Sequence, residues 1–314
     1  MAQVMEKLIV VPIDGSENVL KTMEYLNLFF GPKHPLKITL FYVLPRLPAI
    51  LVEEIRQSGE TRRQLKNLED RNNQIAERLL AAGKKRLVDM GFAEQTVEAV
   101  FKRIEVGVAR DIVNWSERNR ADAVIISTRG RSKLAAFFMG ETANKVLEYS
   151  RICPVWMVKG IVKNKQALIA IDNSGNAMRA VDHAGFMLSG TDVNVTIFHA
   201  KRELRRFLSK ELADEFPEFQ KFWQRKTGEV MLPFIQKAKD ILLDAGLREE
   251  QITTKLIDGS RSTSADIVEE AQRSGAGALF LGLRGYSNVK DYTMGSITRK
   301  VLHQTEDMAV CIVP

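Results

Sequence analysis

A glycine-rich stretch in the second half of the chain has the composition of a phosphate-binding loop. Gly282 and Gly285 follow an apolar run, and Gly295-Ser296 stands after nine further residues, where a helical pattern begins. Glycine lets a backbone approach a phosphate and adopt a positive φ, and successive amides in such a turn bind anions. Ser296 is the predicted N-cap of the next helix, whose first amides carry a partial positive charge. The pattern therefore predicts a phosphate site.

Asp172 is the second candidate for chemistry. It ends the apolar run KQALIAID at residues 165–172. Open α/β sheets bind ligands at the carboxyl ends of their strands, so an Asp there is placed to hydrogen-bond a base or a ribose. The alternative is that Asp172 caps a helix in a strand–helix turn, and its spacing alone does not choose between the two interpretations.

The elements that position these residues are visible as an internal repeat. Both halves begin with an apolar run that ends in Asp and is followed two residues later by Ser, and later segments match at an offset of 155 residues. The matching pairs are 7–14 with 165–172, 109–131 with 264–286, and 154–158 with 309–313. The repeat predicts two similar domains, residues 1–160 and 161–314, joined by a short linker.

Within each half, apolar runs alternate with helical patterns, which predicts parallel sheets covered by helices. The strands expected in the second half are 166–171, 193–199, 251–257, 277–281 and 309–313. A long, mainly helical insert follows the second strand of each half, at roughly 45–95 and 201–250. Pro217 and Pro233 are expected to break or kink the second insert.

The pattern Gly-x-x-Gly-nine-Gly-Ser, with an early strand that ends in Asp, resembles the universal stress protein family over both halves of the chain. The resemblance implies an α/β fold of two tandem Rossmann-like domains, each a five-stranded parallel sheet in the order 3-2-1-4-5 with helices on both faces. It also implies that the last strands of the two halves pair, so that 154–158 lies beside 309–313 in an intramolecular pseudo-dimer. A further homodimer is left open.

The resemblance implies ATP, with or without Mg²⁺, between the first strand and the glycine loop. Adenine or ribose would meet Ala170, Asp172 and Ala200, and Leu281 and Gly282 would lie against the ribose. The phosphates would be held by Arg284, Gly285, Gly295, Ser296 and Ile297. His199 is interpreted as a packed histidine at a strand end.

The first half departs from this pattern at two positions. Ser127 and Glu141 stand where the second half has Gly282 and Ser296. Two like charges about 4 Å apart repel by about 4 kcal/mol at an effective dielectric of about 20, so Glu141 is expected to exclude phosphate, although Glu at a helix start also suits the helix dipole. The matching residues that remain are Asp14, Arg129, Gly130 and Gly140. The first domain is therefore expected to be a structural partner that binds ATP poorly or not at all.

Composition limits the other classes of function. The net charge is +7, and the densest basic cluster is Lys201, Arg202, Arg205 and Arg206, without interleaved aromatic residues, so nucleic acid is not expected as a partner. The two cysteines, Cys153 and Cys311, predict no disulfide framework and no metal site, which fits the cytoplasm. No apolar run approaches the roughly 20 residues that span a bilayer, and no membrane association is expected.

The predicted function is that of an adenine-nucleotide-binding stress-response or regulatory protein without enzymatic activity, whose protein partners the sequence does not identify. Two alternatives remain: a slow ATP hydrolase or nucleotidyl transferase, and a nucleotide-free scaffold. The chain lacks the Walker pattern with its lysine. Lys290 and Asp291 lie in the glycine loop and are interpreted as solvated charges. The second glycine loop argues against the scaffold for its half of the chain.

Overall fold

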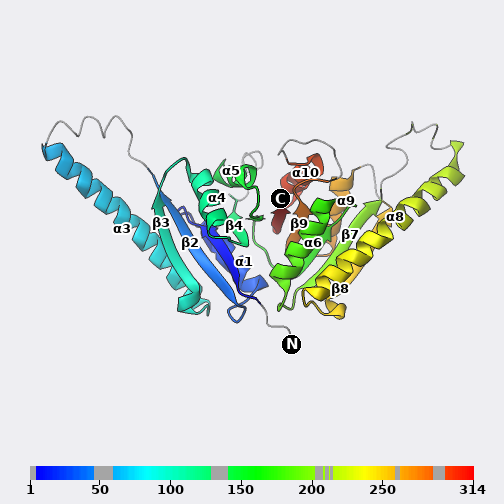
Figure 1. Cartoon of the computed structure of the whole chain (residues 1–314), viewed down its shortest axis with the longest axis horizontal. Helices are drawn as coiled ribbons and strands as arrows, with labels where there is room; N and C mark the ends of the chain where they lie inside the picture. The colour runs from blue at the N-terminus through cyan, green and yellow to red at the C-terminus, as the bar shows by residue number, and fades with distance from the viewer. Residues whose placement is uncertain are drawn as a thin grey trace.

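A computed structural model describes residues 5–45, 59–128, 141–201, 208, 212, 215–258, 262–285 and 294–314 (Figure 1). The chain forms two similar halves that meet at the centre of the molecule, with the long helices α3 and α8 on the outside (Figure 1). Among the described residues, none of the helices combines the length and apolar character that a bilayer crossing requires.

The strands of the first half are β1 (Lys7–Pro12), β2 (Leu36–Leu44), β3 (Val97–Arg103), β4 (Ala123–Ser127) and β5 (Val155–Val158). Its helices are α1 (Asn18–Phe29), α3 (Gly59–Asp89), α4 (Val108–Arg118) and α5 (Glu141–Tyr149), with a short 3-10 turn η1 (Glu94–Thr96).

The strands of the second half are β6 (Gln166–Ala170), β7 (Asn194–Lys201), β8 (Ile252–Asp258), β9 (Ala278–Gly282) and β10 (Ala309–Val313). Its helices are α6 (Gly175–Leu188), α8 (Pro217–Asp244), α9 (Thr263–Arg273) and α10 (Ser296–Gln304), with the 3-10 turn η4 (Glu249–Gln251). Each predicted strand is present within one or two residues of its expected ends.

All ten strands form one sheet in the order β3-β2-β1-β4-β5-β10-β9-β6-β7-β8. Each half therefore has the predicted order 3-2-1-4-5 with parallel pairing. The two halves join where β5 and β10 run antiparallel, with Cys311 opposite Trp156. The predicted pairing of the two last strands is confirmed.

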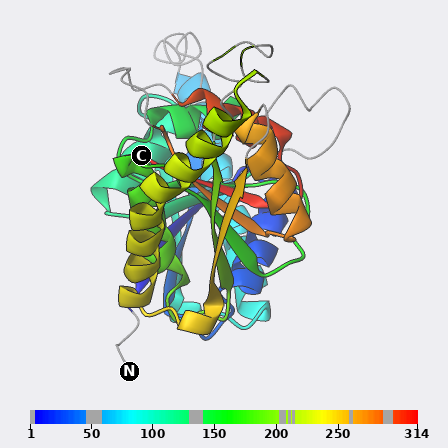
Figure 2. The same cartoon turned by 90° about the vertical axis from the view of Figure 1, so that its right-hand side faces the viewer.

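Helices cover both faces of the sheet, as predicted for strands that are apolar throughout. One face is covered by α1, α3, α6 and α8, and the other by α4, α5, α9 and α10. Figure 2 shows α8 and α9 on opposite sides of the strands of the second half. The cluster of buried side chains on the α1 and α6 face contains residues of both halves, so the two halves share one core layer.

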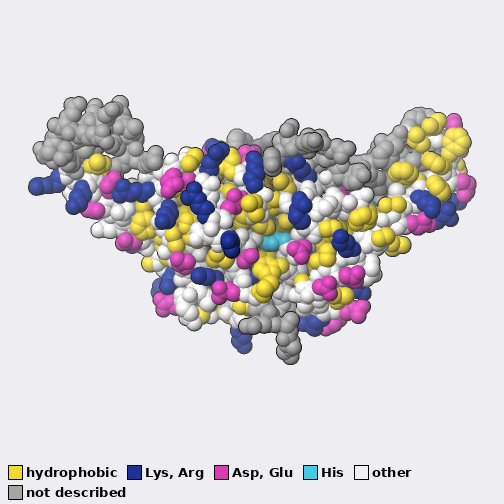
Figure 3. All heavy atoms as spheres, viewed as in Figure 1, with side chains coloured by type: hydrophobic (Ala, Val, Ile, Leu, Met, Phe, Trp, Pro, Cys, Tyr) yellow, Lys and Arg dark blue, Asp and Glu magenta, His cyan; other side chains and the backbone are white. Residues whose placement is uncertain are grey.

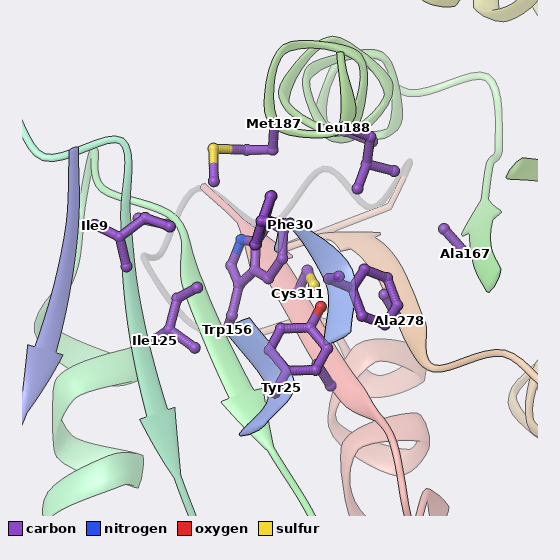
Figure 4. Close-up of a cluster of buried hydrophobic side chains, with 14 of the residues drawn as sticks. Ile9, Tyr25, Phe30, Ile125, Trp156, Ala167, Met187, Leu188, Ala278 and Cys311 are labelled. Carbon is purple, nitrogen blue, oxygen red and sulfur yellow. The ribbon is translucent and has the colours of Figure 1, made fainter. Parts of the chain in front are cut away.

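Trp156 stands at the centre of this shared layer. Its indole Nε1 donates a hydrogen bond to Nε2 of His183 on α6, 2.9 Å away. His183 is buried, and burial lowers its pKa to about 3, so the ring is neutral near pH 7. Figure 4 shows Trp156 among side chains of both halves, with Tyr25 and Phe30 from the first half and Met187 from the second.

A buried lysine adds a polar contact at the same junction. Nζ of Lys7 on β1 donates to the carbonyl of Ser189, which follows α6, at 3.2 Å, and lies 3.2 Å from Nε2 of His34. Burial lowers the pKa of Lys7 to about 8. Apolar and polar contacts thus join the end of α6 to the first half.

Pro217 breaks the insert as predicted, since residues 212 and 215 are helical, Phe216 is not, and α8 begins at Pro217. Pro217 is the first residue of α8, a position where the absent N–H has no intrahelical partner to lose. Pro233 lies inside α8, and the helix continues to Asp244. The carbonyl that loses its donor belongs to Glu229, an exposed residue, where water can replace the missing bond.

Candidate functional site

All ten residues predicted to hold a nucleotide line one cavity of about 200 Å³. By the same measure a single water needs about 10–15 Å³, so the space admits a small organic group. The cavity lies at the carboxyl ends of β6, β7 and β9, beside the first residues of α9 and α10. The sequence did not single out six other lining residues: Ile171, Ala177, Phe198, Thr263, Ile267 and Thr298.

Asp172 organises the turn between β6 and α6. Its Oδ1 accepts a hydrogen bond from the backbone N–H of Ser174 at 3.0 Å. The N-cap of α6 is Ser174, whose hydroxyl accepts from Ala177 N at 3.2 Å. The alternative in which Asp172 caps the helix is therefore wrong, and its carboxylate remains at the edge of the cavity.

Gly285 brings the glycine loop against this carboxylate. A Cβ atom added at Gly285 would lie 2.6 Å from Oδ2 of Asp172, which is closer than the non-bonded contacts that Cβ atoms make in proteins. A side chain at position 285 would therefore push the loop and Asp172 apart. Glycine at position 285 therefore lets the loop, distant in sequence, lie directly against the Asp172 carboxylate.

Gly282 is required for a different reason from the one expected. A Cβ at this position would lie 2.8 Å from the backbone carbon and from Cβ of Asn176 on α6. The expected positive φ is also wrong, since neither Gly282 nor Gly285 has its φ in the left-handed region. Close packing between β9 and α6, rather than an unusual backbone conformation, accounts for the glycine at 282.

The N-terminus of α10 borders the cavity. Ser296 is the first helical residue and Gly295 is the N-cap, so the prediction that Ser296 caps the helix is wrong by one position. Gly295 offers no side chain to bond the first amides, whereas Ser262 accepts from Ala265 N at 3.4 Å at the start of α9. The first amides of a helix have no intrahelical acceptor, so the start of α10 suits an anionic group.

Thr298 ties this helix to the sheet. Its hydroxyl donates to the carbonyl of Gly282 at 3.0 Å, and Gly295 N donates to the carbonyl of Leu283 at 2.9 Å. The two bonds hold the start of α10 against the end of β9. The sequence signal for Thr298 was its position in the first turn of a predicted helix, which is too common to be informative.

His199 is half-buried near the end of β7 and lines the cavity. Its Nδ1 lies 2.7 Å from the carbonyl oxygen of Ile171. A carbonyl only accepts, so Nδ1 carries the proton in this contact. The prediction of a packed histidine at a strand end agrees with this bond, and the ring also lines the cavity.

The lining of the cavity combines apolar and polar groups. Part of the lining is apolar and comes from the strands and from α9, namely Ala170, Phe198, Ala200, Ile267 and Leu281. The polar part of the lining consists of Asp172, Arg284, the glycines and the start of α10. An apolar slot beside amides and a guanidinium suits a flat organic ring attached to an anion. Within the described ranges, three or more His, Cys, Asp or Glu residues do not gather as a metal would need.

The first half repeats part of this arrangement. Oδ1 of Asp14 accepts from Ser16 N at 2.9 Å, as Asp172 does from Ser174. β4 ends at Ser127. Glu141 opens α5 and is paired with Lys145. Residues 129–140, which include Arg129, Gly130 and Gly140, lie outside the described residues.

A further difference between the halves emerges from the strand register. Phe41 and Phe198 each pair with the last residue of the first strand of their half. Two residues beyond them stand Val43 and Ala200, both buried. The Val43 side chain is larger than that of Ala200 by two methyl groups. The first half therefore has a bulkier side chain at the position where Ala200 forms the cavity wall in the second half.

The sequence singled out two sets of charged residues, one in the glycine loop and one after β7, and the structure describes only Lys201 among them. Lys290 and Asp291 lie outside the described residues, as do Arg202, Arg205 and Arg206. Lys201 ends β7, and its Nζ pairs with Asp258 of the neighbouring strand at 2.5 Å.

Cys153 and Cys311 are both buried free thiols.

Comparison with known proteins places the chain among relatives of one kind. The pattern of the universal stress protein family matches residues 5–159 and 163–312. A universal stress protein from Archaeoglobus fulgidus DSM 4304 has a similar structure, with a TM-score of 0.66 and 21% identity over 98% of this chain and 97% of that one.

Two further solved structures are similar. One is a functionally unknown protein from Pseudomonas aeruginosa PAO1, with a TM-score of 0.53 and 16% identity over 98% of this chain and 92% of that one. The other is a protein from Pseudomonas aeruginosa UCBPP-PA14, described as a universal stress protein, with a TM-score of 0.51, 15% identity and the same two coverages. A search of curated proteins found no match.

Proposed function

The chain belongs to the universal stress protein family as a tandem member, and we propose that its second domain binds an adenine nucleotide and that occupancy regulates its partners. The observation that carries this proposal is the single cavity around which Asp172, the glycine loop and the start of α10 meet. The proposed ligand is ATP, with or without Mg²⁺, in a stress-response protein of the cytoplasm.

The chemistry of the cavity supports this orientation of the ligand. Adenine fits the apolar part of the lining beside Ala170 and Ala200, where a small side chain leaves room for a ring. The ribose lies by Leu281 and Gly282, within reach of the Asp172 carboxylate. The phosphates lie by Arg284, Gly285 and the first amides of α10, where positive charge and N–H donors gather.

The first domain is proposed to bind the nucleotide weakly or not at all. Val43 narrows the position that Ala200 leaves open. Glu141 adds a carboxylate at the helix start where phosphate would lie. Its pairing with Lys145 reduces this repulsion without removing the steric effect of Val43.

The proposal assigns binding and regulation, without turnover. Among the described residues that line the cavity, the ionisable side chains are those of Asp172, His199 and Arg284. Oδ1 of Asp172 and Nδ1 of His199 are engaged with backbone groups. This set is suited to hydrogen-bonding a ligand, whereas hydrolysis needs a base that positions the attacking water.

Calorimetry with ATP on the full chain tests the proposal, with three variants. Gly285→Ala places Cβ against Asp172 and is expected to abolish binding. Ser296→Glu adds a carboxylate at the phosphate position and is expected to weaken binding at least tenfold. Gly107→Ala is the matched control, because a Cβ there meets nothing within 4 Å.

One site in the parent and in Gly107→Ala, lost in Gly285→Ala, is the expected result. Competition with ADP, AMP and cyclic AMP then identifies the preferred nucleotide. Two sites in the parent would contradict the assignment of the first domain. Product formed from bound ATP would favour the hydrolase, and the absence of binding in the parent would refute the nucleotide proposal and leave the scaffold.

A further inference from the structure

The first turns of α8 carry an exposed aromatic surface that the cavity does not use. Phe216 is 56% exposed, Phe219 49% and Phe222 44%. The rings of Phe219 and Phe222 are nearly parallel, with centroids 6.0 Å apart. In Figure 3, hydrophobic side chains gather at the upper right, over this end of α8. We call Phe216, Phe219 and Phe222 the aromatic surface.

The aromatic surface makes no contribution to the core. The buried residues of α8 begin at Gly228, and none of the three phenylalanines belongs to either cluster of buried side chains. The helix in the same position of the first half, α3, contains no aromatic residue over its whole length. The fold therefore does not require these side chains, and exposed aromatic groups of this kind mark interaction sites.

The charges around the aromatic surface limit the partner. Between residues 215 and 229 there are three acidic and three basic residues, so the helix start has no net charge. The charged residues are Glu215, Glu218, Lys221, Arg225, Lys226 and Glu229. An anionic lipid surface or a nucleic acid would require an excess of cations.

The order of these charges favours a copy of the same helix. Glu215 and Glu218 precede the aromatic pair, and Arg225 and Lys226 follow it. In an antiparallel pair of identical helices, the acidic start of one copy lies beside the basic third turn of the other. A two-fold axis between Phe219 and Phe222 gives such an isologous, self-complementary contact.

We propose that the aromatic surface binds the same surface of a second copy of this chain, with the two α8 helices antiparallel. Phe219 of each copy packs against Phe222 of the other, and the flanking charges pair across the axis. This contact is distinct from the β5–β10 pairing, which joins the two halves inside one chain. It does not depend on the proposed ligand.

Sedimentation equilibrium of the full chain tests this contact. The parent is expected to dimerise, and Phe219→Ser with Phe222→Ser to raise the dimer dissociation constant at least tenfold. The matched control is Leu68→Ser with Ile75→Ser on α3, two side chains of similar exposure. The control is expected to dimerise as the parent does, and circular dichroism checks that both variants are folded.

Two variants test the orientation. Glu215→Lys and Lys226→Glu are each expected to weaken the dimer several-fold, and their combination to restore it, because the axis places residue 215 of one copy opposite residue 226 of the other. Mixed chains carrying Phe219→Cys and Phe222→Cys are expected to cross-link to each other under mild oxidation, since the native Cys153 and Cys311 are buried.

A parent that stays monomeric would overturn the proposal. So would a dimer that keeps its affinity in the double serine variant, because its contact would lie elsewhere. The proposal would also be overturned, in favour of a lipid surface, by a monomeric parent that co-sediments with phosphatidylserine vesicles while the double serine variant does not.

Discussion

His183 should make the stability of the protein depend on pH in a defined direction. Burial lowers its pKa to about 3 in the folded chain, against 6.5 for an exposed histidine. A histidine whose folded pKa is depressed contributes fully above its unfolded pKa. As pH falls below about 6.5, His183 is protonated in the unfolded chain and stays neutral in the folded one. The contribution of His183 to the free energy of unfolding therefore decreases progressively between about pH 6.5 and about pH 3.

The magnitude follows from the width of that window. One pKa unit corresponds to about 1.4 kcal/mol, so the free energy of unfolding should fall by about 2 kcal/mol between pH 7 and pH 5 through this group alone. Other groups titrate over the same range, so the parent must be compared with a variant. His183→Gln does not titrate, and its amide oxygen can still accept the Trp156 bond.

Urea unfolding at pH 7 and pH 5 measures the effect. The difference between the two pH values should be about 2 kcal/mol larger in the parent than in His183→Gln. Trp156 lies in the contact, and its fluorescence reports the same transition. An equal loss in both proteins would refute the reasoning, because His183 would then titrate alike in the folded and unfolded chains.

Three further predictions concern the cavity and the core. Thr298→Val removes the bond to the Gly282 carbonyl and should weaken nucleotide binding by calorimetry, with recovery in Thr298→Ser; unchanged affinity in the valine variant would show that the bond does not position α10. Leu242→Ala empties a fully buried position on α8 and should cost about 2–5 kcal/mol in urea unfolding, whereas a loss well below 1 kcal/mol would mean that the site collapses. Burial raises the pKa of Cys153 to about 12, so a thiol reagent should modify it only after unfolding, and rapid reaction of the native chain would contradict its burial.

Local patterns in the sequence were sufficient for the elements and for most of the cavity. The strand runs are apolar because helices cover both faces of the sheet, and this signal needs no knowledge of the partner strand. The repeat located Asp172 and the glycine loop at corresponding strand ends. Parallel strands bring such ends to one edge, so the ten chosen residues line one cavity.

The reasons for individual residues came only from the tertiary structure. Gly282 faces Asn176, and Gly285 faces Asp172, more than 100 residues earlier in the chain. A composition pattern shows that glycine is present, but it does not show which atom excludes a side chain.

The junction between the halves was decided by contacts that no local pattern records. The sequence predicted that β5 and β10 pair, through the family resemblance. It did not predict that Trp156 of one half bonds to His183 of the other, or that Lys7 is buried at Ser189. A buried polar side chain is stable only with a partner, and that partner is known only when the two halves are brought together.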